Sequence, residues 1–194
     1  MFHVYARGNR KADISRDDVD CRTYVGLLGA VVTRMRWTCL AYCLMPNHVH
    51  LLLTTPEPNL GRGMQRLHGR YAETFNARHG EVGHVFQGRY GAVAVTDDAQ
   101  LLTTVGYIAA NPVSAGLVAD PAAWRWSSHR AISGLEVAPP WLAAGTLLEL
   151  LSAFGGSGGE RYRELVAGRV PPAGVTDSLS ETTTTGAGSG SAVR

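Results

Sequence analysis

The stretch "AYCLMPNHVHLLLT", residues 41–54, predicts two β-strands joined by a short turn. Apolar residues run on both sides of "MPN", and proline and asparagine are typical turn residues. We therefore predict strands over residues 36–44 and 48–54. His48 and His50 interrupt the apolar run of the second strand. Because side chains alternate along a strand, both imidazoles point to one face, with their Cα atoms about 7 Å apart.

Outward from these two strands, the residue pattern predicts the order β-α-β-β-α-β. Apolar residues alternate in the strands and recur at helical spacing in the helices. The predicted elements are a strand at 2–7, a helix from 16–18 to 35, the two strands above, a helix at 60–77, an extended stretch at 85–96 and a helix at 98–110. Asp97 or Thr96 can cap the last helix, and Pro112 is expected to end or kink it. This order predicts an α+β fold, a ferredoxin-like βαββαβ sandwich with extra C-terminal helices.

The chain divides by composition into three predicted parts. Residues 1–130 carry the βαββαβ pattern, and residues 131–170 contain two further helical stretches, at 140–154 and 159–167. Residues 171–194 are rich in Gly, Ser and Thr and almost lack large apolar groups, so we predict a disordered tail.

Composition excludes several classes of protein. A hydrophobic content of 45% supports a packed core, but no run of 18 apolar residues predicts a membrane span. The N-terminus lacks a secretory pattern, and three cysteines do not suggest a disulfide framework, so we expect a cytoplasmic protein. Among 18 basic residues only Lys11 is lysine. Arginine suits phosphate contacts, although a GC-rich genome produces the same bias, so this signal for nucleic acid is weak.

The histidine pair has three interpretations on residue pattern alone. Two imidazoles on one strand face form half of a metal site, but they can equally be hydrogen-bonded side chains without a ligand. Zinc is a further alternative, because Cys39 and Cys43 precede the pair and share a face if residues 36–44 form a strand. That spacing is not a familiar zinc pattern, and buried cysteines are the commoner explanation.

Five motifs in order carry a resemblance to a known family. They are "YARGN" at 5–9, "LMPNHVHLLL" at 44–53, "GRYAETFNARHGEVGHVFQGRY" at 69–90, "YIAANPVSAGLV" at 107–118 and "WRWSSH" at 124–129. Together they resemble the IS200-like tyrosine transposase superfamily, in particular its branch associated with repetitive extragenic palindromes (REP). The resemblance covers residues 2–130. Ser114 departs from it, because an arginine is usual at that position.

The resemblance implies an HUH endonuclease, in which two histidines and a divalent metal assist a tyrosine nucleophile on single-stranded DNA. It implies that Tyr107 is the catalytic tyrosine, that His48 and His50 bind Mg²⁺ or Mn²⁺, and that Asn111 is the third ligand. The spacing agrees, since residues 107 and 111 are neighbours on one helix face. Asn111 could instead cap the helix before Pro112.

The implied reaction cleaves and rejoins DNA at hairpin sites through a 5′-phosphotyrosine intermediate. The implied partner is single-stranded or hairpin DNA, a homodimer is possible, and no membrane is involved. The alternative is a domesticated protein that binds hairpins without completing transposition.

Basic side chains give candidate DNA contacts at three places. The candidates are Arg7, Arg10, Lys11, Arg66, Arg70 and Arg89. Those at 66 and 70, with Arg62, are spaced by four and line one face of a helix, which could also be a plain solvated surface. Trp124 and Trp126 could stack on bases, but core packing is the commoner role. Tyr5 is expected in the core.

Overall fold

The computed structural model describes residues 1–170 and centres on a four-stranded antiparallel sheet. Its strands are β1 (Phe2–Arg7), β2 (Thr38–Leu44), β3 (His48–Thr54) and β4 (Gly91–Ala94), in the spatial order β2-β3-β1-β4. Every neighbouring pair is antiparallel. The first and second strands of the chain are therefore split by the third, as the βαββαβ pattern requires, and the predicted ferredoxin-like fold is confirmed.

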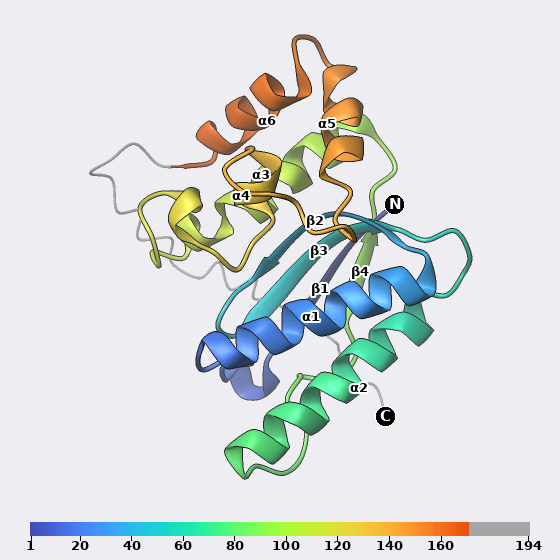
Figure 1. Cartoon of the computed structure of the whole chain (residues 1–194), viewed down its shortest axis with the longest axis vertical. Helices are drawn as coiled ribbons and strands as arrows, with labels where there is room; N and C mark the ends of the chain where they lie inside the picture. Colours follow the sequence, from blue (N-terminus) through green and yellow to red (C-terminus); the bar gives the residue numbers. More distant parts are fainter. Residues whose placement is uncertain (171–194) are drawn as a thin grey trace, which may run out of the picture.

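Two groups of helices enclose the sheet. Figure 1 shows α1 (Asp18–Met35) and α2 (Leu60–His79) side by side on one face, and α3 (Asp98–Ser114) on the other with the later helices. The remaining elements are η1 (Asn9–Lys11), η2 (Pro121–Ala123), α4 (His129–Ile132), α5 (Ala144–Ser152) and α6 (Gly158–Ala167). Side chains of β3 therefore alternate between two buried environments, which explains its nearly continuous apolar run.

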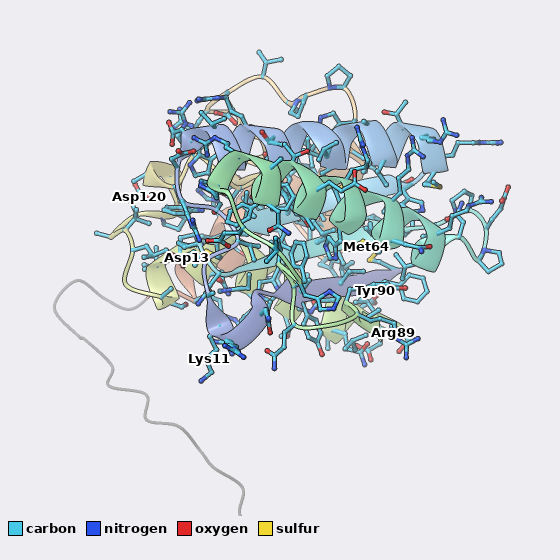
Figure 2. All side chains as sticks on the ribbon, turned by 90° about the horizontal axis from the view of Figure 1, so that it is seen from below. Lys11, Asp13, Met64, Arg89, Tyr90 and Asp120 are labelled. Atoms are coloured by element: carbon cyan, nitrogen blue, oxygen red, sulfur yellow. The ribbon has the colours of Figure 1, made fainter. Side chains whose placement is uncertain are left out.

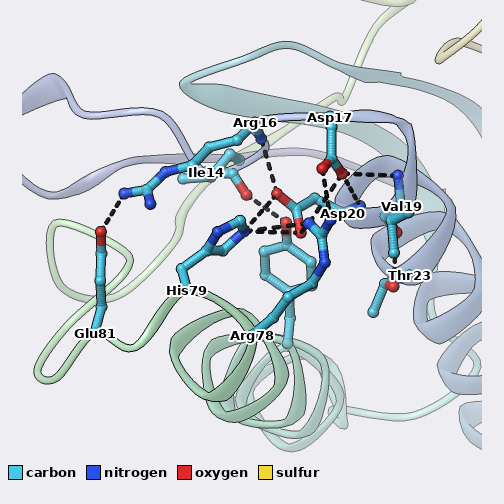
Figure 3. Close-up of polar contacts among 10 residues, drawn as sticks. Ile14, Arg16, Asp17, Val19, Asp20, Thr23, Arg78, His79 and Glu81 are labelled. Carbon is cyan, nitrogen blue, oxygen red and sulfur yellow. Dashed lines mark hydrogen bonds and ion pairs between the residues drawn. The ribbon is translucent and has the colours of Figure 1, made fainter.

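The α1–α2 layer is joined by a buried carboxylate near the start of α1. Asp20 is 2% exposed and accepts hydrogen bonds from Arg78 and His79 at the end of α2 (Figure 3). Asp17 caps α1 by accepting from the amides of residues 19 and 20, and it also pairs with Arg78. Beside them Arg16 pairs with Glu81, and the Tyr71 hydroxyl donates to the Ile14 carbonyl. These contacts hold α1 and α2 in register.

Trp37 fixes the other end of this layer. It lies between α1 and β2, and its indole N–H donates to the Asn59 side chain at 2.6 Å. A Cβ added at Gly63 of α2 would lie 2.1 Å from the Trp37 ring, so only glycine lets the helix approach this closely.

A bulge in β2 lies between the two cysteines that were expected to share a face. Cys39 pairs with Leu53 and Cys43 pairs with His50, with a register shift between Cys39 and Ala41. Leu53 and His50 point to opposite faces of β3, so the two cysteines also do. The expectation that they share a face is wrong, because the bulge inserts one residue and reverses the alternation.

The helix α3 continues past Pro112, which was expected to end or kink it. It runs through Pro112 to Ser114, so the predicted end at residue 110 is wrong. Pro112 lies in the last turn, where its missing N–H removes one helical bond. The amides of Ala115 and Leu117 still donate to the carbonyls of Asn111 and Pro112. The other end is as expected, because Asp97 caps the helix through the amide of Gln100.

The C-terminal helices pack against α3. The helices α5 and α6 contact each other, and α6 contacts α3. His129 Nδ1 lies 3.1 Å from the Tyr162 hydroxyl, which joins α4 to α6. Helices thus occur within residues 131–170 as expected, and the division of the chain at residue 130 stays a prediction. The tail predicted at 171–194 lies outside the described residues. Within residues 1–170 no helix is both long and apolar enough to cross a membrane.

Candidate active site

The structure brings the two histidines of β3 to the tyrosine and asparagine of α3. The Tyr107 hydroxyl lies 3.3 Å from Nε2 of His50, and Oδ1 of Asn111 lies 3.0 Å from Nε2 of His48. The two imidazole centroids are 5.0 Å apart. Strand alternation presents the rings on one face, and the helical spacing of four presents the phenol and amide above them. All four side chains belong to one chain.

Three of these side chains, His48, His50 and Tyr107, line a cavity that is open to solvent. Tyr107 is 37% exposed, whereas His50 and Asn111 are buried. The cavity has a volume of about 520 Å³. Its lining comprises Tyr5, Ala6, Arg7, His48, His50, Gln87, Arg89, Gly91 and Tyr107. No carboxylate is among them, so the two arginines make the cavity suitable for a phosphate group.

Each imidazole is held through Nδ1 and presents Nε2 to the site. His48 Nδ1 lies 2.7 Å from Oδ1 of Asn47, which accepts the Nδ1–H of that ring. His50 Nδ1 lies 3.0 Å from Nε2 of His3. When the Tyr107 hydroxyl donates to Nε2 of His50, the Nδ1–H of His50 donates to His3, and the three side chains form one hydrogen-bonded chain. Such partners fix the tautomer and the direction of the free nitrogen.

Burial keeps the two imidazoles neutral. Desolvation lowers the pKa of His50 to about 3, with smaller contributions from His48 and His3. Desolvation also lowers the pKa of His48, although the amide oxygen of Asn111, which can accept Nε2–H of the protonated ring, opposes the shift. A neutral imidazole carries the lone pair that a metal ion requires, so both rings are in the state that binds metal at neutral pH.

The chemistry of these groups fits a divalent cation. With Nδ1 of His48 donating to Asn47, its Nε2 is an acceptor that faces another acceptor, the amide oxygen of Asn111. A cation between them satisfies both lone pairs. Within residues 1–170 no group of three His, Cys, Asp or Glu side chains could hold a metal, and Oδ1 of Asn111 would add an oxygen ligand to the two imidazoles.

The cysteines do not contribute to this set. Cys39 and Cys43 face opposite sides of the sheet, and both are fully buried. Burial raises the pKa of Cys39 to about 12 and also raises the pKa of Cys43. Within residues 1–170 neither cysteine belongs to a group of three His, Cys, Asp or Glu side chains that could hold a metal. These observations disfavour the zinc alternative.

Comparison with protein families decides the classification. The family model described as "Transposase IS200 like" matches residues 1–111, more than half of the chain. The chain belongs to the IS200-like transposase family. It is accordingly a DNA-cleaving transposase, and the matched span contains both histidines, Tyr107 and Asn111. A search of curated proteins found no match.

One solved structure shares the fold of this transposase, and a second is similar over half of the chain. One is a REP-associated tyrosine transposase bound to a REP hairpin, with 19% identity over 71% of this chain and 81% of that chain, and a TM-score of 0.57. At this identity the likeness concerns the fold. Another structure, assigned as a transposase from Deinococcus radiodurans, has 20% identity over 51% of this chain and 81% of that chain, with a TM-score of 0.42.

Two residues of β1 join the site of the transposase although the sequence did not single them out. His3 contacts His50, and Tyr5, which was expected in the core, is 44% exposed and lines the cavity. That expectation is wrong because β1 pairs with β3 in a register that sets Tyr5 opposite His50 and Arg7 opposite His48. The alternation His3-Tyr5-Arg7 was a usable signal, but only the pairing of β1 with β3 gives it meaning.

The helix-cap interpretation of Asn111 is wrong. The helix α3 ends three residues later, and the Asn111 side chain is buried against His48 rather than placed at a helix end. Trp124 and Trp126 pack partly buried against the core, with the Trp124 indole donating to the Leu44 carbonyl at 2.9 Å. The core role considered for both tryptophans is therefore the one that the structure favours.

The predicted DNA-contacting residues fall into three places. Arg7 and Arg89 line the cavity, and Arg10 and Lys11 lie exposed in η1 with left-handed backbone angles. Figure 2 shows Lys11 and Arg89 on the side of the molecule away from α1. The other two candidates lie on α2, on the opposite side of the sheet from Tyr107. They line a separate groove of about 830 Å³ that also includes Arg34 and Arg62. The residues of that groove are Arg34, Met35, Arg62, Gln65, Arg66, Gly69, Arg70 and Glu73.

Proposed function

We propose that this transposase is a metal-dependent single-strand endonuclease that cleaves and rejoins DNA at hairpin sites. One observation carries the proposal: an exposed phenol, Tyr107, lies within 3.3 Å of one of two converging imidazoles. The family match supports DNA cleavage, and the fold shared with a REP-associated transposase supports assignment to that branch.

Tyr107 is the proposed nucleophile. Its oxygen forms a bond to the scissile phosphorus as the bond from phosphorus to the 3′-oxygen breaks, which leaves a 5′-phosphotyrosine and a free 3′-hydroxyl. The phenol gives up its proton to a base, and the leaving oxygen takes one up. Because the phosphodiester bond energy is kept in the phosphotyrosine, another 3′-hydroxyl can attack and rejoin the strand.

The proposed cofactor is Mg²⁺ or Mn²⁺, held by Nε2 of His48, Nε2 of His50 and Oδ1 of Asn111. When bound, the cation withdraws charge from the phosphate and orients it for in-line attack. Mixed nitrogen and oxygen ligands suit Mn²⁺, whereas Mg²⁺ prefers oxygen alone. His3 and Asn47 contact Nδ1 of His50 and His48, which leaves Nε2 of His50 beside Tyr107 and Nε2 of His48 beside Asn111.

The basic residues are proposed to hold the DNA backbone. Arg7 and Arg89 line the same cavity as the phenol and suit the phosphates next to the cleavage point. Arg10 and Lys11 extend this surface, while Arg66 and Arg70 suit a separate part of the hairpin on the α2 side. Since the site forms within one chain, Tyr107 can act on DNA held by its own histidines. Homodimer formation and a cytoplasmic location stay predictions.

A hairpin-binding protein without complete transposition is the second candidate. The groove on the α2 side favours it, because its arginines lie across the sheet from Tyr107 and can bind phosphates without any chemistry.

A denaturing gel with a hairpin oligonucleotide, labelled so that the covalent product is visible, separates the two candidates. We expect a protein–DNA adduct with Mn²⁺ or Mg²⁺, none in chelator, and none for Tyr107→Phe although that variant still binds DNA. Tyr42→Phe is the matched control, because Tyr42 is buried and packs on Trp141 away from the site. Tight binding without any adduct under all metal conditions supports the second candidate.

A further inference from the structure

A second cavity lies between α2 and residues 83–90, next to the one that contains Tyr107. It has a volume of about 600 Å³. Resting on the proposed function, we propose that this cavity, here called the base cavity, receives an unpaired nucleobase of the DNA strand that the transposase cleaves. None of the DNA contacts predicted from the sequence places a base in this cavity.

The base cavity adjoins the catalytic cavity through one residue. Arg89 lines both of them, and its side chain is exposed. A strand whose phosphate contacts Arg89 can therefore direct its scissile phosphate toward Tyr107 and turn a neighbouring base toward α2. No carboxylate lines either cavity, so nothing along this path repels a polyanion.

The walls of the base cavity suit a flat, partly polar ring. Met64, Ala72 and Phe86 provide apolar surface, and Tyr90 provides a half-buried aromatic ring. The side chains of Gln65 and His84 are exposed at the cavity and carry hydrogen-bond donors and acceptors. Bases removed from a stack are bound by the same combination of apolar or aromatic faces and polar groups at the base edge.

Gly69 leaves one wall of the base cavity open. It lies in the interior of α2, where alanine is more favourable for a helix. Unlike Gly63, it has no structural neighbour that excludes a side chain, since an added Cβ would meet nothing within 4 Å. It lines the base cavity, so the missing side chain keeps space there for a flat ring.

The test combines substitutions that fill the base cavity with a fluorescent base analogue that reports on one DNA position at a time. The full-length protein is mixed with a hairpin oligonucleotide that has single-stranded arms, in which 2-aminopurine replaces one arm base at a time. Gly69→Leu and Ala72→Leu fill the base cavity from two positions, and only the first also borders the arginine groove. Gly26→Leu is the matched control, because Gly26 is an equally open glycine in the interior of α1.

We expect one arm position to change its fluorescence on binding to the wild-type protein. Removing the base at that position should weaken binding roughly 5- to 150-fold, the range for losing one stacked base. Both filling variants should lose the fluorescence change and bind the intact oligonucleotide with the same weakened affinity. Removing the base at that position should then weaken DNA binding by the two filling variants little further. Gly26→Leu should behave as wild type.

The outcomes separate this proposal from the proposed function. If wild-type protein forms the covalent adduct but no arm position responds, or both filling variants bind as wild type, the base cavity proposal is overturned. If one position responds and both filling variants abolish that response, but no adduct forms with any metal, the base cavity stands and the endonuclease proposal fails. Loss of affinity in Gly69→Leu alone would assign the effect to the arginine groove and also overturn the proposal.

Discussion

The Tyr107 hydroxyl lies 3.3 Å from Nε2 of His50, although the two residues are 57 positions apart in the chain. His50 is in turn joined through Nδ1 to Nε2 of His3, at 3.0 Å. The candidate site therefore combines residues from β1, β3 and α3, on both sides of the interface between the sheet and a helix.

His3 should control how well His50 binds metal. In His3→Ala the Nδ1 of His50 loses its partner, and we expect the affinity for Mn²⁺ to fall about 10- to 100-fold, as for other residues that orient metal ligands. His3→Gln restores a polar group near Nε2 and should recover much of the affinity. Calorimetric titration with Mn²⁺ measures both. Wild-type affinity in His3→Ala would remove His3 from this role.

Asn111 should be needed as an oxygen ligand rather than as a helix cap. Asn111→Leu keeps the size of the buried side chain but removes the amide oxygen that faces His48. We expect Mn²⁺ binding and adduct formation to be lost, while Asn111→Asp, which keeps an oxygen, should retain both. Full adduct formation by Asn111→Leu would contradict the assignment.

The stability of the metal-free protein should depend on pH through His50. Its folded pKa of about 3 lies below the value of about 6.5 for an unfolded histidine, so the unfolded state binds more protons between these values. Stability contributed by this group is present above pH 6.5 and is lost as the pH falls toward 3. His50→Gln should therefore lose less stability than wild type over this window, when unfolding is followed by urea titration in chelator. The control variant His84→Gln, at an exposed histidine, should lose as much stability as wild type over the same pH range.

Asp20 should contribute strongly to folding. Asp20→Ala leaves His79 and Arg78 without their buried carboxylate, and breaking such a pair costs roughly 3 kcal/mol, the low end of the range because Arg78 keeps Asp17. Asp18→Ala, which removes only exposed ion pairs, should cost less than about 1 kcal/mol. Urea unfolding measures both. Equal losses of unfolding free energy in Asp20→Ala and Asp18→Ala would show that burial of Asp20 is unimportant.

Arg89 should contribute one phosphate contact. Arg89→Ala is expected to weaken binding of a hairpin oligonucleotide and to lower the slope of log affinity against log salt by about 1. Arg163→Ala on α6 removes an exposed arginine that lies outside both cavities and should leave that slope unchanged. Anisotropy titrations over a range of salt concentrations provide the comparison. An unchanged slope in Arg89→Ala would exclude the contact.

Local periodicity in the sequence predicted much of the fold and half of the site. Alternation placed His48 and His50 on one face, and helical spacing placed Tyr107 above Asn111, because both relations depend only on backbone geometry over a few residues. The resemblance, rather than periodicity, connected the two pairs. Errors occurred where a single residue changes the local rule, at the bulge beside Cys39 and at Pro112 in the last turn of α3.

The remaining features of the fold and the site depended on how segments far apart in the chain pack together. The antiparallel register between β1 and β3 brought His3 and Tyr5 into the site, and the placement of α2 behind the sheet separated Arg66 from Arg89. A strand's own sequence shows which residues share a face, but not which other strand or helix that face will meet. That choice depends on how distant apolar surfaces bury one another, so it belongs to the tertiary structure.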